Sequence, residues 1–215
     1  MRRLLLLAAV TVLAAVVVSP LLADDFMPPD FRGDPLTYLA VWEFTNPPVN
    51  QYDIDPDFVT DVGDGYHSLF SAYTHVNYDN ATLFWDPTGF IYTTDQPSQI
   101  DVELNNWIDD YQFKHVWIQI TYSGQGMPTV VDVRGADSSE QWSDPYPGQF
   151  VHQIDFDPSH AMDYWIIQPN PNMESILIDI PPFTSIDEIV VDTWSTDEPV
   201  GNEQRSWSDV KTLFR

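Results

Sequence analysis

The chain has no cysteine and few residues that favour helices or bind anions. Among its 215 residues there are only two lysines and seven glutamates, and eight basic side chains face 33 acidic ones. Without cysteine there is no disulfide, no thiolate nucleophile and no thiol that could carry a lipid. So few Lys and Arg exclude ordinary nucleic-acid binding and polybasic adhesion to an anionic membrane.

Sequence motifs of catalysis are also missing. There is no G-x-S-x-G elbow, no H-E-x-x-H zinc helix and no glycine-rich phosphate loop, and the five histidines never form a tight pair. Residues 186–192 lack the E-x-D-x-E pattern that jelly-roll glucanases carry on one strand. We therefore predict no catalytic residue, and glycoside hydrolase is only the third interpretation of the chain.

Residues 1–23 have the form of a secretory signal peptide. Two arginines precede a run of fifteen residues in which Thr11 alone is polar, and Ala23 stands directly before two aspartates. The alternative is a retained membrane anchor, because residues 4–23 are just long enough to cross a bilayer. Removal of 1–23 would leave 33 acids and six bases, a net charge of −27. We expect a secreted or periplasmic protein with no membrane contact after cleavage.

Aspartate and aromatic residues dominate the remaining chain. Of the 33 acids, 26 are aspartates, which favour turns, and all thirty aromatic residues follow Ala23. Aromatic and β-branched residues suit the half-buried surface of a sheet. The composition therefore predicts an all-β fold with little helix, namely an antiparallel β-sandwich of jelly-roll type.

The order of these residues predicts one domain. We expect an extended leader at 24–35, the β-sandwich domain at 36–195 and a polar tail at 196–215. Strands are expected at 37–45, 69–78, 81–85, 89–93, 99–107, 114–122, 129–134, 150–156, 161–168, 174–180 and 186–194.

The strand at 114–122, KHVWIQITY, alternates strictly between apolar and polar residues. On its polar face Trp117 could stack on a sugar ring while His115 and Gln119 bind hydroxyl groups, and Trp142 and Tyr146 on a later loop could form a rim. We predict these five residues as a ligand-binding site. The alternative is that loops cover this face, which would make Trp117 a packing residue.

Five aspartates follow one another at the spacing of a twelve-residue calcium loop. Counted from Asp53, oxygen ligands fall at positions 1, 3, 5, 9 and 12, which are Asp53, Asp55, Asp57, Asp61 and Asp64. The loop lacks the glycine usual at position 6 and the glutamate usual at position 12. It predicts a structural Ca²⁺ ion, with a solvated turn as the alternative.

Three segments carry a resemblance to a known group. VWEF at 41–44, VWIQITY at 116–122 and IDEIVVDTW at 186–194 resemble segments of uncharacterised exported bacterial β-sandwich proteins, some of them sorted by a C-terminal PEP-CTERM signal. This chain has no Pro-Glu-Pro motif. The resemblance implies an exported β-sandwich and implies no functional residue.

The sequence as a whole predicts an exported, non-catalytic binding protein with polysaccharide as its ligand. The second interpretation is a structural or matrix protein of the cell exterior whose copies associate through cations. The acidic surface would keep such a protein soluble and would attract cations. The sequence leaves the oligomeric state open.

Overall fold

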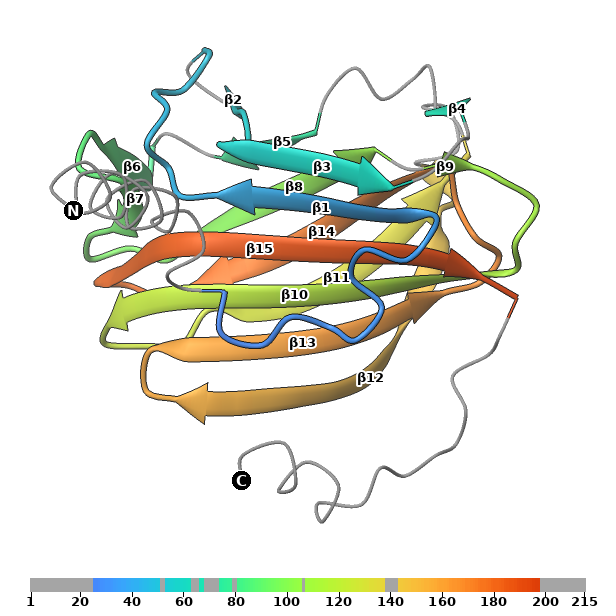
Figure 1. The fold of residues 1–215 in the computed structure, drawn as a ribbon. Helices are drawn as coiled ribbons and strands as arrows, with labels where there is room; N and C mark the ends of the chain where they lie inside the picture. The colour runs from blue at the N-terminus through green and yellow to red at the C-terminus, as the bar shows by residue number, and fades with distance from the viewer. Residues whose placement is uncertain are drawn as a thin grey trace, which may run out of the picture.

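The computed structural model describes residues 25–50, 53–62, 66–67, 74–78, 81–105, 107–137 and 143–197. These ranges are nearly all antiparallel β-strand and contain no α-helix (Figure 1). Within them, no helix is long and apolar enough to cross a membrane. The prediction of an all-β fold with little helix is confirmed.

Fifteen strands are assigned in the described ranges. They are β1 (Thr37–Trp42), β2 (Asp53–Ile54), β3 (Phe58–Val62), β4 (Tyr66–His67), β5 (His75–Tyr78), β6 (Leu83–Asp86), β7 (Phe90–Thr93), β8 (Ser98–Asn105), β9 (Trp107–Ile108), β10 (Phe113–Gly124), β11 (Thr129–Ala136), β12 (Tyr146–Asp157), β13 (His160–Ile167), β14 (Met173–Ile180) and β15 (Thr184–Thr196).

Thirteen strands form one antiparallel sheet. Its order is β2-β5-β8-β14-β11-β12-β13-β10-β15-β1-β3, and the hairpin β6–β7 attaches to β15. Strands β4 and β9 pair separately. Figure 1 shows β8, β14 and β11 lying behind β1, β15 and β10, so the sheet curls back on itself.

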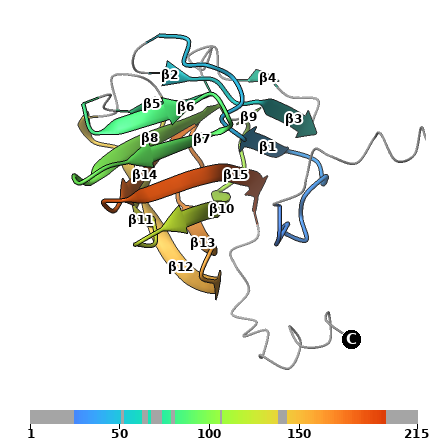
Figure 2. The same cartoon turned by 90° about the vertical axis from the view of Figure 1, so that its left-hand side faces the viewer.

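The curl turns at β12. Its first two residues pair with β11, and from Gly148 onward it pairs with β13. A Cβ atom at Gly148 would lie 2.4 Å from the carbonyl oxygen of Val133, so only glycine allows this close crossing. Figure 2 shows the two halves of the sheet side by side and joined at this strand.

The interior of the curl is one hydrophobic core. Alternate residues of each half point into it, for example Ile118 of β10 and Val191 of β15 from one half, and Val102 of β8 and Ile176 of β14 from the other. The result is one curled sheet, a half-barrel. The finer prediction of a jelly-roll sandwich is not confirmed.

A short seam brings together the two edges of the sheet. Edge strands β2 and β3 are joined by residues 55–57 alone. The fully buried Trp42 donates its indole N–H to the carbonyl oxygen of Ile54 across this seam, at 3.2 Å. The sequence predicted a loop here, because two- and five-residue strands are too short to show a clear alternation.

Candidate ligand-binding face and neighbouring charged clusters

One row of side chains crosses four strands on the outer surface of the sheet. Cα pairing places Asp192 of β15 beside Trp117 of β10, Trp117 beside Tyr164 of β13, and Tyr164 beside His152 of β12. The Trp117 ring lies 5.5 Å from the Tyr164 ring and 6.1 Å from the His152 ring, centre to centre. We call this row, together with its neighbours His115, Gln119 and Trp194, the aromatic face.

Alternation along β10 explains why these residues share a surface. Val116, Ile118 and Ile120 point into the core, so the residues between them point outward. His115 lies beside Trp194 in the pairing, and its Nδ1 atom is 2.5 Å from the hydroxyl oxygen of Tyr164. Burial raises the pKa of Tyr164 to about 12, so this hydroxyl stays protonated at neutral pH.

The N-terminal segment of the described chain lies across the aromatic face. We call residues 25–32 the strap. The backbone of Met27 is bound through both of its polar groups: its N–H donates to Gln119 Oε1 at 2.7 Å, and its carbonyl oxygen accepts from Trp117 Nε1 at 2.9 Å. Gln119 also donates from Nε2 to Asp25 at 2.8 Å. Gln119 is consequently only 1% exposed, whereas Trp117 stays half-buried.

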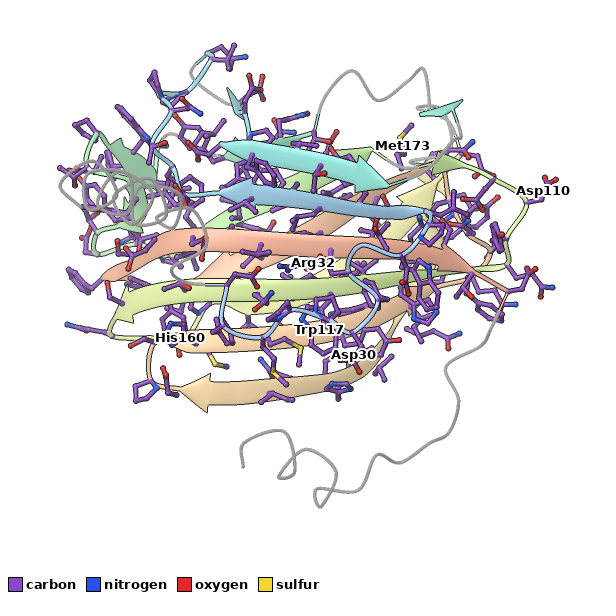
Figure 3. The ribbon with its side chains drawn as sticks, in the orientation of Figure 1. Asp30, Arg32, Asp110, Trp117, His160 and Met173 are labelled. Atoms are coloured by element: carbon purple, nitrogen blue, oxygen red, sulfur yellow. The ribbon has the colours of Figure 1, made fainter. Side chains whose placement is uncertain are left out.

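At the other end of the strap, Arg32 forms ion pairs with two carboxylates. Arg32 donates to both carboxylate oxygens of Asp192, at 2.6 and 2.5 Å, and forms a second ion pair with Asp25. Burial by itself would lower the pKa of Arg32, but its hydrogen bonds to the two carboxylates outweigh burial and raise it. Figure 3 shows Arg32 and Trp117 on the same face of the sheet, over the middle of β10.

Aromatic contacts complete the strap. The Phe31 ring stacks on Trp194 at 5.4 Å and an interplanar angle of 18°, and Phe26 lies 4.7 Å from the ring of His160. The structure therefore brings together three of the five predicted ligand residues, Trp117, His115 and Gln119, and places the protein's own strap on them.

The two predicted rim residues do not join this face. Tyr146 begins β12, packs against the core and donates its hydroxyl to Asp137 at 2.8 Å. Trp142 lies outside the described residues. The rim prediction assumed one long loop, but Tyr146 is in a strand because it pairs with Gly135 of β11.

The aspartates of the predicted calcium loop lie along the seam. Asp53 is in β2, where its carboxylate accepts from Asn50 and is 3.8 Å from His75. Asp55 is exposed, whereas the side chain of Asp61 and the whole of Asp64 lie outside the described residues. Among the described residues, no group of three His, Asp or Glu side chains could hold a metal ion.

Asp57 has protein donors on both carboxylate oxygens. Its Oδ2 accepts from the backbone N–H of Glu43 at 2.8 Å, and its Oδ1 accepts from Thr45 and from Asn46. These three donors follow β1 directly. Asp57 therefore ties the start of β3 to the end of β1, a structural role that the loop spacing did not indicate.

A second polar row lies on the outer surface of the other half of the sheet. Cα pairing aligns His75 of β5, Glu103 of β8, Ser175 of β14 and Arg134 of β11. Asp101 is two residues before Glu103 on the same face; it accepts from Ser175 at 2.6 Å and pairs with Arg134 at 3.4 Å.

Both carboxyl groups of this second row hold protons more tightly than usual. Burial raises the pKa of Asp101, against the opposing effects of Ser175 and Arg134. Burial likewise raises the pKa of Glu103, against the opposing charge of His75. We did not predict this row from the sequence, although Asp101 and Glu103 have the i, i+2 spacing that places two side chains on one face of a strand.

A buried ion pair joins the two halves of the sheet inside the curl. Lys114 of β10 and Glu174 of β14 are both fully buried, and Lys114 Nζ lies 3.9 Å from Glu174 Oε1 and 2.5 Å from Ser195 Oγ. Burial lowers the pKa of Lys114 and raises that of Glu174, each against the opposing charge of its partner.

Comparison of the chain with protein-family models, with curated proteins and with solved structures found no match.

Proposed function

We propose that the protein is an exported, non-catalytic binding protein that takes its ligand on the aromatic face. The observation that carries this proposal is the row Asp192, Trp117, Tyr164 and His152, which presents aromatic rings and hydrogen-bonding groups side by side across four strands. Such a surface combines apolar area with a few fixed polar groups, as binding sites generally do.

The proposed ligand class is a polysaccharide. The amide of Gln119 both accepts from and donates to the strap, and Trp117 donates its indole N–H. A sugar hydroxyl both donates and accepts, so a glycan can satisfy the same groups. Because the strap holds these groups, the ligand must displace residues 25–32.

The curled sheet supports the proposal of a binding protein. We infer that the curled sheet is a variant of the jelly-roll β-sandwich, because side chains of both halves meet in one core. The same proposal includes export through residues 1–23 and the likeness to exported bacterial β-sandwich proteins. It also includes a structural calcium ion held by the aspartates of the predicted loop, Asp53, Asp55, Asp57, Asp61 and Asp64.

Affinity electrophoresis in gels containing single polysaccharides tests this function. We expect the protein, purified after export of the full chain, to be retarded by one polymer. Trp117→Ala should abolish the retardation, while Phe84→Ala, which removes an exposed ring from β6, should leave it unchanged. A variant whose strap is loosened by Arg32→Gln should bind more tightly. Retardation that is equal for wild type and Trp117→Ala would refute the aromatic face as the site.

A second candidate function is glycoside hydrolysis at Asp101 and Glu103. Two carboxyl groups on one strand face can supply the acid and the base that hydrolysis of a glycosidic bond requires, and burial raises the pKa of both, as the acid needs. Side chains two residues apart on a strand have Cα atoms about 6.6 Å apart. Release of reducing sugar that is lost in Glu103→Gln but kept in Asp179→Asn, an exposed residue of β14, would support it. No release from the polymers that the wild type binds would eliminate it.

A further inference from the structure

We propose that the strap exchanges between two copies of this chain, so that each copy covers the aromatic face of the other. This inference goes beyond the proposed function. It concerns the same surface but needs no polysaccharide, so the two proposals can fail separately.

The contacts of the strap depend on the face and not on chain connectivity. Met27 binds Trp117 and Gln119, and Arg32 binds Asp192, which are residues 90 to 160 positions away in the sequence. A strap from a second copy would make every one of these contacts with the same geometry. Exchange between copies therefore loses none of the interactions that hold the strap down.

The segment between strap and sheet is the hinge that exchange requires. Backbone hydrogen bonds from Arg32 to Pro29 and from Asp34 to Phe31 turn the chain back toward β1. Gly33 has a φ of 89° and Leu36 a φ of 66°, both in the left-handed region. Leucine adopts this region at a cost because its Cβ crowds the backbone. An extended hinge removes that cost, which favours the exchanged form.

The hinge gives the strap its reach. Residues 33–36 number four, and a chain of that length spans about 13 Å when extended. The strap also stands at the end of the chain if cleavage follows Ala23 as predicted, so exchange requires no threading of one chain through another.

The charge of the face fits the strap of any copy of this chain. Asp192 is buried on the face and requires a cation opposite it, and Arg32 supplies one. Cations are scarce in this chain, with eight Lys and Arg in all, and yet one of them is placed on this carboxylate. Another copy carries the same strap with the same arginine.

Engineered disulfides test the exchange. Because the chain has no cysteine, any introduced pair forms the only disulfide. Phe26 and His160 face one another across strap and sheet, with ring centres 4.7 Å apart. We expect Phe26→Cys protein mixed with His160→Cys protein at high concentration, and then oxidised, to give a cross-linked heterodimer. The matched control, Phe26→Cys mixed with Phe84→Cys, should give none.

Light scattering provides the second measurement. The wild type should change from one-chain to two-chain mass as its concentration rises, and the oxidised double variant Phe26→Cys/His160→Cys should stay a monomer until it is reduced. A wild type that is monomeric at every concentration and yields no heterodimer would overturn the proposal. A dimer that persists in the locked double variant would also overturn it, because another surface would then hold the copies together.

Two hinge variants keep the proposal testable if the cysteine variants fail to fold. Leu36→Gly relieves the left-handed backbone without opening the hinge, so dimerisation should weaken several-fold. Leu36→Pro fixes φ near −65°, which the closed hinge cannot adopt, so dimerisation should strengthen. Equal dimerisation in both variants would contradict the role of the hinge.

Discussion

Lys114 and Glu174 are charged residues whose burial costs stability. They point into the core from opposite halves of the sheet, and neither carboxylate oxygen of Glu174 has a hydrogen-bond partner among the described residues. Burial of two charges costs free energy that their attraction only partly returns. The pair therefore fixes how the two halves align more than it stabilises them.

Replacing both residues of this pair should cost little. We expect Lys114→Met/Glu174→Leu to be as stable as the wild type within about 1 kcal/mol, or more stable. Glu174→Leu alone should lose about 3 kcal/mol because it leaves the buried lysine without its carboxylate. Urea unfolding at pH 7 measures both. A double variant as unstable as the single one would show that the pair stabilises the fold.

Asp192 should make stability depend on pH. Burial raises its pKa to about 6 from an ordinary 3.8, against the opposing effects of Arg32, and Asp25 adds to the rise. The folded protein thus binds the proton more tightly than the unfolded chain. The resulting stability is complete below about pH 4 and is lost as the pH rises through 6, a change of about 3 kcal/mol.

The variant Asp192→Asn should flatten the pH dependence between pH 4 and 6. Thermal unfolding across this range measures the effect, and Asp179→Asn on the exposed side of β14 is the matched control. The same slope in Asp192→Asn and in the wild type would mean that other groups cause the pH dependence.

At this scale, alternation in the sequence could place His115, Trp117 and Gln119 on one face of a strand, and they do share a face. The sequence could not show that Arg32 lies on Asp192, because 160 residues separate them. Pairing of that kind depends on the order of strands in the sheet, which no local pattern encodes.

Among the elements, β3 is held to the end of β1 in part by one side chain, that of Asp57. Asp57 accepts three hydrogen bonds that tie β3 to the end of β1. Each bond to a charged group contributes about 1.5–3 kcal/mol, and the three are not additive. Asp57→Ala should therefore lose about 2–3 kcal/mol in urea unfolding.

Asp55→Asn is the control for this variant, because Asp55 is an exposed neighbour on the same connection. Equal losses in the two variants would contradict a specific role for Asp57. Repeating the series with calcium and with chelator tests the proposed ion: a rise in melting temperature with calcium in the wild type, and not in Asp57→Ala, would support it.

Elements were predictable from the sequence where they are long. The alternation at 114–122 predicted most of β10, and the strand expected at 174–180 covers all of β14 but its first residue. Strands β2 and β3 were not predicted, because they form only where the curled sheet closes. β3 pairs with the edge of β1 that would otherwise be exposed. The aspartate spacing in that stretch suggested a metal loop instead.

Over the whole molecule, charge opposes the fold. The formal net charge is −25, so the acidic side chains repel one another more when the chain is compact. We expect the melting temperature to rise by several degrees between about 0.01 and 0.5 M sodium chloride, as the screening length falls below about 5 Å. A melting temperature that falls over this range would show that attractive ion pairs, such as Arg32 with Asp192, outweigh the repulsion.

Composition could predict the fold class of the whole molecule, but it could not predict that the sheet curls back on itself. Aspartate-rich turns and aromatic residues pointed to an all-β chain, as observed. Each half of the curl is built from pairings such as β8 with β14 and β10 with β15, which join segments some 70 residues apart. Strand order of this kind follows from global packing, so the sequence could not distinguish one curled sheet from two separate ones.

Amide hydrogen exchange of residues 25–32 in dilute protein measures whether the strap occupies the aromatic face. We expect the Met27 amide to exchange at least about tenfold more slowly than in a free peptide of the same sequence, since it is bound to Gln119 Oε1. This protection should disappear in Gln119→Ala while the amides of β10 stay protected. Exchange in the wild type as fast as in the free peptide would show that the strap leaves the aromatic face open.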